Sequence, residues 1–274
     1  MTTRVALVTG GSSGIGEDAA LRLKEKGFEV YAVARRVDKM KGLADAGVHV
    51  FGMDVTDEAS MSEGVQRIIA EQGRIDVLVN NAGYGSFGAV EDVPIDEGRR
   101  QFEVNLFGLA RLIQLVLPTM REQHSGLIVN ISSIGGHFYE PLGAWYHATK
   151  HAVEGFSDSL RLELRPHGIN VAIIEPAAIR SEWADIAADS MLETALGGAY
   201  ESQARKAAAV FERTYSPGMS SGPDIVGKAI VKAATARRPR TRYPVGKGAR
   251  TIIRSRRLLP DRVFDRIVHT MFTR

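Results

Sequence analysis

The residues with the clearest potential for chemistry are a tyrosine, a lysine and a serine. Tyr146 and Lys150 lie four residues apart, and Ser133 lies thirteen residues before the tyrosine. Side chains at positions i and i+4 of a helix share a face, so the spacing predicts a lysine ammonium near the phenol. A nearby positive charge lowers a phenol pKa from its usual value near 10 and makes tyrosine a better proton-transfer group. The spacing therefore suggests acid–base chemistry, although the same pair also occurs in helices where the tyrosine packs and the lysine is solvated.

A second motif lies near the N-terminus. The apolar run at residues 5–8 predicts a buried parallel strand, and the segment from Thr9 to Gly16 follows it with the sequence TGGSSGIG. An amphipathic stretch at residues 17–26 predicts a helix that ends before Gly27. Glycines let the backbone approach a pyrophosphate, and the N-terminus of a helix attracts its charge. The pattern predicts a nucleotide-diphosphate cradle; a glycine turn without a ligand is the alternative.

Taken together, these motifs resemble the short-chain dehydrogenase/reductase family. The resemblance rests on the segment from Thr9 to Gly16, on Asn-Asn-Ala-Gly at residues 80–83, and on Ser133, Tyr146 and Lys150. The order and spacing match the branch with T-G-x-x-x-G-x-G and Y-x-x-x-K motifs over approximately residues 4–185. The closest members in pattern are the NADP-dependent hydroxysteroid or retinol dehydrogenase-like enzymes and the carbonyl reductases. The resemblance implies hydride transfer between a nicotinamide and a ketone or secondary alcohol.

The same resemblance implies four catalytic residues. Tyr146 exchanges a proton with the substrate oxygen, as general acid in reduction or base in oxidation. Lys150 lowers the pKa of that phenol and binds the nicotinamide ribose, and Ser133 hydrogen-bonds the substrate oxygen. Asn105 matches an asparagine that positions a water for proton relay, although an asparagine at a helix kink is the alternative.

The cofactor is expected to be NADP(H). Arg35 and Arg36 follow the predicted second strand, at the place where an arginine accommodates the 2′-phosphate and an acidic residue would hold the ribose of NAD. Solvated surface charge is the other interpretation of this pair. Asp54 is expected to contact the adenine or to stabilise its own turn. The further predicted cofactor contacts are Gly10, Ser12, Ser13, Gly14, Ile15, Gly16, Val55, Asn81, Ala82, Gly83, Tyr146, Lys150, Pro176, Ile179 and Ser181.

The alternation of apolar runs and helical patterns predicts an α/β fold with one doubly wound Rossmann sheet, mostly parallel and covered by helices on both faces. We expect a single catalytic domain over residues 1–274, with a substrate lid at about 183–223 and a basic C-terminal extension at about 237–274. The predicted strands are residues 5–8, 29–34, 48–53, 75–79, 127–131 and 170–174, and further helices are predicted at 61–71, 96–121 and 145–165.

Composition narrows the function classes. The chain has no cysteine, which excludes disulfides and thiolate-bound zinc. His147 and His151 have a spacing that could share a ligand face, but without a glutamate between them or a third ligand we expect no metal site. The first residues lead directly into a strand, and no uninterrupted apolar run approaches about 20 residues, so a cytoplasmic protein is expected. No nucleic-acid-binding motif accompanies the basic charge.

The substrate is the least readable part of the function. The lid region carries apolar side chains that favour a hydrophobic substrate such as a steroid, a retinoid or a long-chain ketone. These residues are Met191, Leu192, Leu196, Tyr200 and Phe211. Four residues between the catalytic serine and tyrosine, or beside them, could line a substrate pocket or simply pack in the core: His137, Phe138, Tyr139 and Trp145.

The C-terminal segment combines basic charge with an apolar stripe at helical spacing. The stripe consists of Val263, Phe264, Ile267, Val268, Met271 and Phe272. Such a helix could lie on a membrane surface, but packing on the protein's own body or on a second subunit is the favoured interpretation. The helices at residues 96–121 and 145–165 are the usual subunit interfaces of the family, which implies a homodimer or homotetramer. A non-catalytic protein that senses NADP(H) is the alternative function, disfavoured because Ser133, Tyr146 and Lys150 are all present.

Overall fold

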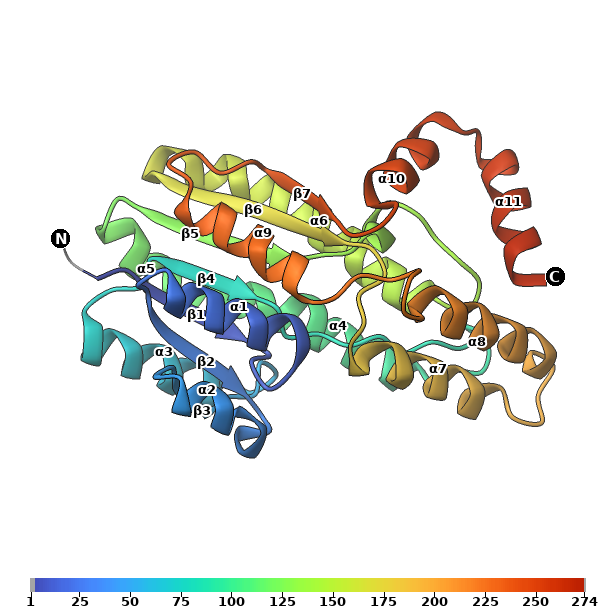
Figure 1. Cartoon of the computed structure of the whole chain (residues 1–274), viewed down its shortest axis with the longest axis horizontal. Helices are drawn as coiled ribbons and strands as arrows, with labels where there is room; N and C mark the ends of the chain where they lie inside the picture. The colour runs from blue at the N-terminus through green and yellow to red at the C-terminus, as the bar shows by residue number, and fades with distance from the viewer. Residues whose placement is uncertain (1–2, 274) are drawn as a thin grey trace.

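The computed structural model describes residues 3–273 and contains a parallel sheet with helices on both faces (Figure 1). The sheet has seven strands in the order β3-β2-β1-β4-β5-β6-β7, and every neighbouring pair is parallel. This is the predicted doubly wound α/β architecture, in which a ligand site is expected at the carboxyl ends of the strands where the order reverses. The strands are β1 (Val5–Thr9), β2 (Glu29–Ala34), β3 (His49–Gly52), β4 (Val77–Asn80), β5 (Gly126–Ile131), β6 (Ile169–Pro176) and β7 (Arg242–Val245).

All six predicted strands are present, and β7 is an additional one. The central strands are almost wholly buried, as their continuous β-branched and apolar runs predict. Strand β7 was missed because its sequence, Arg-Tyr-Pro-Val, contains a proline and a charge. Within a sheet, proline is found mainly in edge strands and at the ends of strands, and β7 is the edge strand beside β6.

Helices pack on both faces of the sheet. One face is covered by α1 (Gly14–Glu25), α2 (Lys41–Asp45) and α9 (Asp224–Thr235), and the other by α3 (Glu58–Gln72), α5 (Gly108–Glu122) and α6 (Ala144–Leu164). Helix α1 begins at Gly14, three residues before the predicted start, so its first turn is part of the glycine motif. The motif therefore presents the N-terminus of a helix at the carboxyl end of β1.

The predicted helix at residues 96–121 is a continuous helical segment with an irregular centre. It consists of α4 (Ile95–Phe102), a π-helical turn (Glu103–Phe107) and α5. The segment Ile95–Glu122 contains an 18-residue stretch with a mean hydropathy of 1.2, so by length and composition alone it would be apolar enough to cross a bilayer. In the fold, its side chains Leu112, Ile113 and Val116 pack against the sheet in one of the two main cores.

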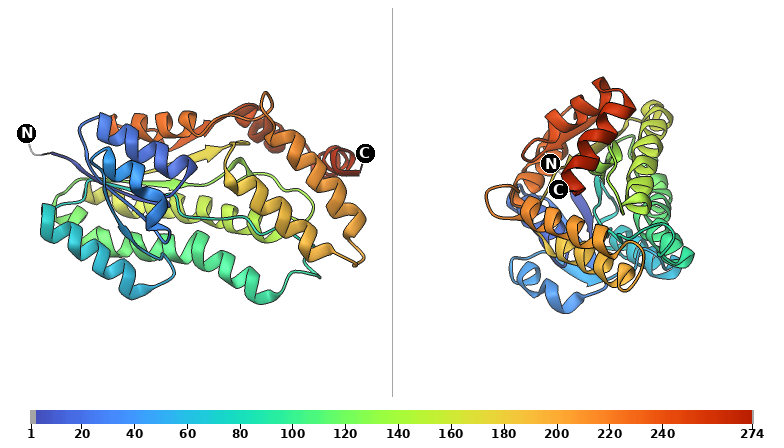
Figure 2. Two further views of the ribbon diagram at one scale, coloured as in Figure 1. Left: turned by 60° about the horizontal axis from the view of Figure 1, so that its bottom comes forward. Right: turned by 90° about the vertical axis from the view of Figure 1, so that its right-hand side faces the viewer.

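Two helical layers extend beyond the carboxyl end of the sheet. The predicted lid region contains α7 (Glu182–Ala195) and α8 (Glu201–Tyr215), and the C-terminal extension contains α10 (Ala249–Leu258) and α11 (Asp261–Thr273). Figure 2 shows α7 and α8 side by side at one end of the molecule, with α11 next to α8. These elements enclose a third apolar cluster that is separate from the two sheet cores.

The C-terminal stripe divides between two environments. Phe264, Val268 and Phe272 are buried against α8 and the β5–α6 loop, in agreement with the favoured packing interpretation. The other three members remain exposed: Val263, Ile267 and Met271.

Candidate active site

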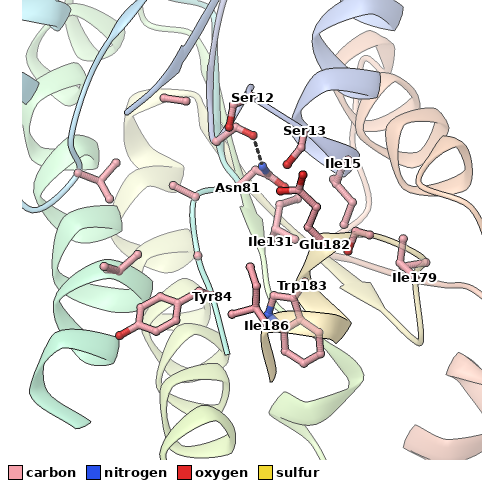
Figure 3. A pocket seen from close by; sticks show the side chains of 18 of the residues that line it. Ser12, Ser13, Ile15, Asn81, Tyr84, Ile131, Ile179, Glu182, Trp183 and Ile186 are labelled. Atoms are coloured by element: carbon pink, nitrogen blue, oxygen red, sulfur yellow. Dashed lines mark hydrogen bonds between the residues drawn. The ribbon is translucent and has the colours of Figure 1, made fainter. Parts of the chain in front are cut away.

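A cleft of about 480 Å³ lies at the carboxyl ends of the strands. Figure 3 shows Ser12 and Ser13 at one end and Trp183 and Ile186 at the other, with Glu182 reaching back towards the serines. All the predicted site residues line this cleft except Gly16 and Asn105, which lie directly behind its wall. The predicted residues in the lining are Gly10, Ser12, Ser13, Gly14, Ile15, Arg35, Arg36, Asp54, Val55, Asn81, Ala82, Gly83, Ser133, Tyr146, Lys150, Pro176, Ile179 and Ser181.

The glycine motif is shaped by contacts that exclude side chains. A Cβ at Gly16 would lie 2.2 Å from the carbonyl oxygen of Gly10, and Gly14 has a φ of +58°. Asn81 holds the turn from the other side, since its amide donates to the carbonyl oxygens of Thr9 (3.0 Å) and Gly10 (3.3 Å). Close backbone packing at the N-terminus of α1 is what a dinucleotide pyrophosphate requires, so these residues fit the predicted group.

The arginines at the end of β2 are exposed and line the cleft near the glycine motif. The Arg36 guanidinium lies 3.0 Å from a carboxylate oxygen of Glu182 and 3.5 Å from the Ser12 hydroxyl. Lys39 binds the other oxygen of Glu182 at 3.2 Å. The ion pairs hold the pKa of Glu182 below its usual value. Arg36 is therefore a salt-bridged residue in this structure, whereas Arg35 extends into solvent.

Asp54 stabilises its own turn and also lines the cleft. One carboxylate oxygen accepts bonds from the backbone nitrogen of Thr56 (2.9 Å) and from its hydroxyl (2.8 Å). The helix cap is Asp57, which accepts from the first backbone nitrogens of α3. The turn interpretation of Asp54 therefore holds, and its cleft position leaves the adenine contact as a prediction.

Tyr146, Ser133 and Lys150 meet in the centre of the cleft. The Lys150 Nζ donates to the carbonyl oxygen of Ile131 at 3.0 Å and lies 5.9 Å from the Tyr146 ring centre. Burial raises the pKa of the Tyr146 phenol, and a hydrogen bond with Ser133 opposes that shift. Burial also lowers the pKa of Lys150 to about 8.

The expected lowering of the Tyr146 pKa by the lysine is not what this structure shows. Burial dominates because the phenol lies among aromatic side chains, and Glu140 adds negative charge nearby. Lys150 contributes to the site by its position and not by a resolved effect on the phenol. At neutral pH the phenol is therefore protonated, which is the form that a general acid needs.

Asn105 lies in the π-helical turn behind the cleft. Its side-chain oxygen accepts from the backbone nitrogen of Tyr84 (3.1 Å), and its amide donates to the Tyr84 carbonyl oxygen (2.9 Å) and the Thr149 hydroxyl (3.1 Å). These bonds tie the irregular turn to the loop after β4 and to α6, as the kink interpretation predicts. The water-relay role of Asn105 stays a prediction.

The segment after β6 forms part of the lining of the cleft. The Ser133 hydroxyl lies 3.5 Å from the carbonyl oxygen of Pro176, and Ile179 forms an isolated parallel bridge with Ser221. Ser181 directly precedes α7 and faces the glycine motif, since a Cβ at Gly14 would lie 3.4 Å from it. The backbone nitrogen of Ala177 donates a hydrogen bond to the carbonyl oxygen of Val245, which ties this segment to β7.

Aromatic side chains surround the phenol. Trp183 and Phe87 lie 5.1 Å and 5.4 Å from the Tyr146 ring, between ring centres, and Phe211 lies 5.1 Å from Phe87. Tyr215 lies 5.9 Å from Trp183. Of the apolar lid residues predicted to favour a hydrophobic substrate, Met191 and Phe211 are buried in this cluster, Leu192 and Tyr200 are half-buried, and Leu196 is exposed.

The four residues that could line a pocket or pack in the core mostly pack. Phe138 and Tyr139 contact Phe264 of α11, and Trp145 packs on Gly98 of α4. The Nε2 of His137 lies 2.6 Å from the Oε1 of Glu175. With Glu154, these two residues offer three atoms of the kind that bind metal ions, all within 4.8 Å of one another. Arg242 already supplies a cation there, at 3.0 Å from Glu154 and 3.3 Å from Glu175.

The structure places two further polar side chains, Glu140 and His147, near the phenol, and neither was predicted from the sequence as a site residue. Burial raises the pKa of Glu140, on the β5–α6 loop, to about 7, and lowers that of His147, on α6, to about 4. Glu140 and Tyr146 also raise the pKa of Tyr215, after burial as the main cause, which places all three groups around one space. No local sequence pattern marks Glu140, and His147 stood out only as half of an unlikely metal pair.

The comparison with protein families matches residues 4–190 to the short chain dehydrogenase family. A probable short-chain type dehydrogenase/reductase of Helicobacter pylori, VdlC, is 34% identical over 95% of this chain and 95% of its own length. A 3-ketodihydrosphingosine reductase of Bacteroides thetaiotaomicron is 36% identical over 97% of this chain and 96% of its own.

Solved structures agree over nearly the whole chain. A short-chain dehydrogenase from Streptomyces avermitilis has a TM-score of 0.78 at 31% identity, covering 98% of this chain and 96% of its own. A serine dehydrogenase complexed with NADP⁺ has a TM-score of 0.76 at 27% identity, with coverages of 88% and 94%. An NAD⁺-bound xylitol dehydrogenase has a TM-score of 0.77 at 26% identity, with coverages of 90% and 99%. The similar structures thus include one protein bound to NADP⁺ and one bound to NAD⁺.

Proposed function

We propose, since this chain belongs to the short-chain dehydrogenase family, that it is an NADP(H)-dependent oxidoreductase acting on an apolar ketone or the corresponding secondary alcohol. The observation that carries the proposal is the meeting of Ser133, Tyr146 and Lys150 in one cleft with the glycine motif. A protein that only senses the nucleotide has no need for all three. Bound NADPH would supply the hydride for the reaction.

The residues divide the remaining work of the reaction. The Tyr146 phenol donates its proton to the carbonyl oxygen as that oxygen gains negative charge, and Ser133 binds the same oxygen. Lys150 donates to the carbonyl oxygen of Ile131, which holds its ammonium 5.9 Å from the centre of the Tyr146 ring, and its proposed further role is to bind the cofactor ribose. Burial keeps the phenol protonated at neutral pH, which is the form that donates the proton when the reaction runs as a reduction.

The preference for NADP(H) is supported by the end of β2. Arg35 and Arg36 are both exposed at the cleft, and no carboxylate occupies the position after the strand. A guanidinium forms paired, charge-assisted bonds with a phosphate. Replacing Arg35 by Asp should therefore weaken NADPH binding more than NADH binding.

The substrate we propose is long and apolar. Trp183 and Tyr215 line the cleft beside Tyr146, and the buried rings of Phe87 and Phe211 pack behind them. One relative of similar length reduces 3-ketodihydrosphingosine, as its name states. We also propose that α7 and α8 act as a lid over this substrate and that the enzyme works in the cytoplasm as a homo-oligomer.

The test is a substrate panel of ketones with NADPH and of secondary alcohols with NADP⁺, run on the wild type and on Tyr146→Phe. Loss of the general acid should reduce ketone turnover by about 10²- to 10⁴-fold. NADPH affinity, measured by calorimetry, should fall far less than turnover because the phenyl ring still fills the site. A panel without any turnover, together with tight NADPH binding, would favour the sensing protein instead.

A further inference from the structure

We propose that Glu140 and His147 form a receptor for an ammonium group that the substrate carries next to its carbonyl carbon. The substrate class would then be a long-chain 2-amino ketone. This inference rests on the proposed function and adds a recognition element to the same site. It assigns a role to two polar side chains that the reaction itself does not use.

His147 presents a buried acceptor that has no partner. Its Nδ1 lies 2.9 Å from the carbonyl oxygen of Gly135, so this nitrogen carries the proton and donates. The ring is neutral at neutral pH, since its pKa is lowered to about 4 by burial. The other nitrogen, Nε2, therefore has a free lone pair, and among residues 3–273 it is buried with no hydrogen-bond partner. The whole residue is only 5% exposed.

Glu140 supplies a second acceptor that faces the first. Its Oε1 lies 3.9 Å from the Nε2 of His147, too far for a direct hydrogen bond. Within residues 3–273 no side chain donates a hydrogen bond to this carboxylate, and its side chain is 16% exposed. Two acceptors therefore meet without a donor between them, and burying such groups unpaired is costly.

The missing donor has a definable chemistry. A substrate hydroxyl has one hydrogen and satisfies one of the two acceptors, whereas an ammonium has three hydrogens and also balances the carboxylate charge. Phe87 and Phe138 pack their rings against His147, and these apolar side chains supply neither a hydrogen-bond donor nor a charge to the two acceptors. An ammonium fits both the acceptors and the charge.

The position of this receptor fixes where the ammonium lies on the substrate. His147 directly follows Tyr146 on α6, and the two ring centres are 5.7 Å apart. Glu140 is near enough to influence the pKa of both Tyr146 and Tyr215. Tyr146 and Tyr215 line the cleft whereas Glu140 and His147 do not, so the receptor adjoins the phenol end of the cleft. We infer that a carbonyl bonded to the phenol brings the carbon beside it towards this receptor.

The decisive experiment compares matched substrates. The probes are a long-chain 1-hydroxy-2-amino-3-ketone, the same ketone without the amino group, and its N-acetyl derivative. The wild type should favour the free amine by about 10- to 100-fold in kcat/KM, the effect of one charge-assisted bond to a buried group. Glu140→Gln should remove that preference, because the neutral amide can donate to His147 and leaves no charge for the ammonium.

Three controls separate the possible outcomes. Glu140→Asp keeps the charge and should retain part of the preference, and Glu193→Gln, an exposed site on α7, should retain all of it. A long-chain primary amine, titrated against the tryptophan fluorescence, should bind the wild type more tightly than the matched alcohol, and Glu140→Gln should abolish the difference. Equal kcat/KM for amino and desamino ketones in the wild type would overturn the ammonium receptor alone. No reduction of any ketone would overturn the proposed function instead.

Discussion

The phenol of Tyr146 and the carboxylate of Glu140 share one apolar environment, and both titrate above their usual pKa because of it. For the phenol, this keeps the proton that a reductase transfers. For the carboxylate, the apolar environment makes ionisation costly, because the charged form of Glu140 loses its hydration. The same penalty should be visible in stability as well as in binding.

We therefore predict a pH-dependent gain of stability in Glu140→Gln. The pKa of Glu140 is about 7 in the folded protein and near 4.5 in the unfolded chain. The contribution of Glu140 to the free energy of unfolding is most favourable below pH 4.5, because the protonated side chain is then buried without charge. This contribution is lost as the pH rises through 7 and is constant above that. The difference corresponds to an upper bound of about 3 kcal/mol. In urea unfolding, Glu140→Gln should thus be more stable than the wild type at pH 8.5. The difference in unfolding free energy between the two proteins should be larger at pH 8.5 than at pH 5.5.

The exposed variant Glu193→Gln serves as the control for this measurement, because its carboxylate lies in solvent on α7. It should change the unfolding free energy by the same small amount at both pH values. A Glu140→Gln gain that is equal at pH 5.5 and 8.5 would contradict the buried ionisation.

At the scale of elements, α7 is tied to the cofactor end of the cleft through Glu182. This residue, in the first turn of the helix, pairs with Arg36 and Lys39. A 2′-phosphate would compete with Glu182 for the same guanidinium. The ion pairs lie at the surface, where each contributes little.

We predict that Glu182→Gln tightens NADPH binding by about 2- to 5-fold at low ionic strength, since each released surface ion pair is worth up to about 1 kcal/mol. NADH affinity should stay the same, because NADH has no phosphate to use the released arginine. Calorimetric titrations in low and high salt measure both effects, and the gain should shrink as salt screens the charges. Asp185→Asn, at an exposed site on the same helix, is the matched control. An equal gain for both cofactors would disprove the competition.

The elements also show what a sequence can and cannot predict. Strands β1 to β6 and the glycine motif were readable because their apolar periodicity and glycine spacing are local properties. Strand β7 was not, because a charged residue and a proline, Arg242 and Pro244, are typical of loops. These residues form a strand only through their pairing with β6, which the local sequence does not show. Glu140 was missed for a related reason. Only the folding of the β5–α6 loop against α6 brings its carboxylate to face His147.

At the scale of the whole molecule, the C-terminal extension supports the loop between β5 and α6. Phe264 of α11 contacts Phe138 and Tyr139, and Phe138 in turn packs on His147. Tyr139 adds a hydrogen bond of 2.8 Å to Asp265. The last helix, more than a hundred residues away in sequence, thereby buttresses the loop that carries Ser133 and Glu140.

We predict that Phe264→Ala destabilises the protein by about 3 kcal/mol, the usual cost of deleting a buried phenylalanine. Ile267→Ala, three residues further on the exposed side of α11, should change stability by less than about 0.5 kcal/mol. Because the cavity opens behind Phe138, Phe264→Ala should also raise the KM for the ketone, whereas the affinity for NADPH, bound at the far end of the cleft, should remain at the wild-type value. Urea unfolding, steady-state kinetics and calorimetry on the two variants measure these effects. If Phe264→Ala weakened NADPH binding as much as ketone binding, α11 would be supporting the fold as a whole and not the substrate side of the site.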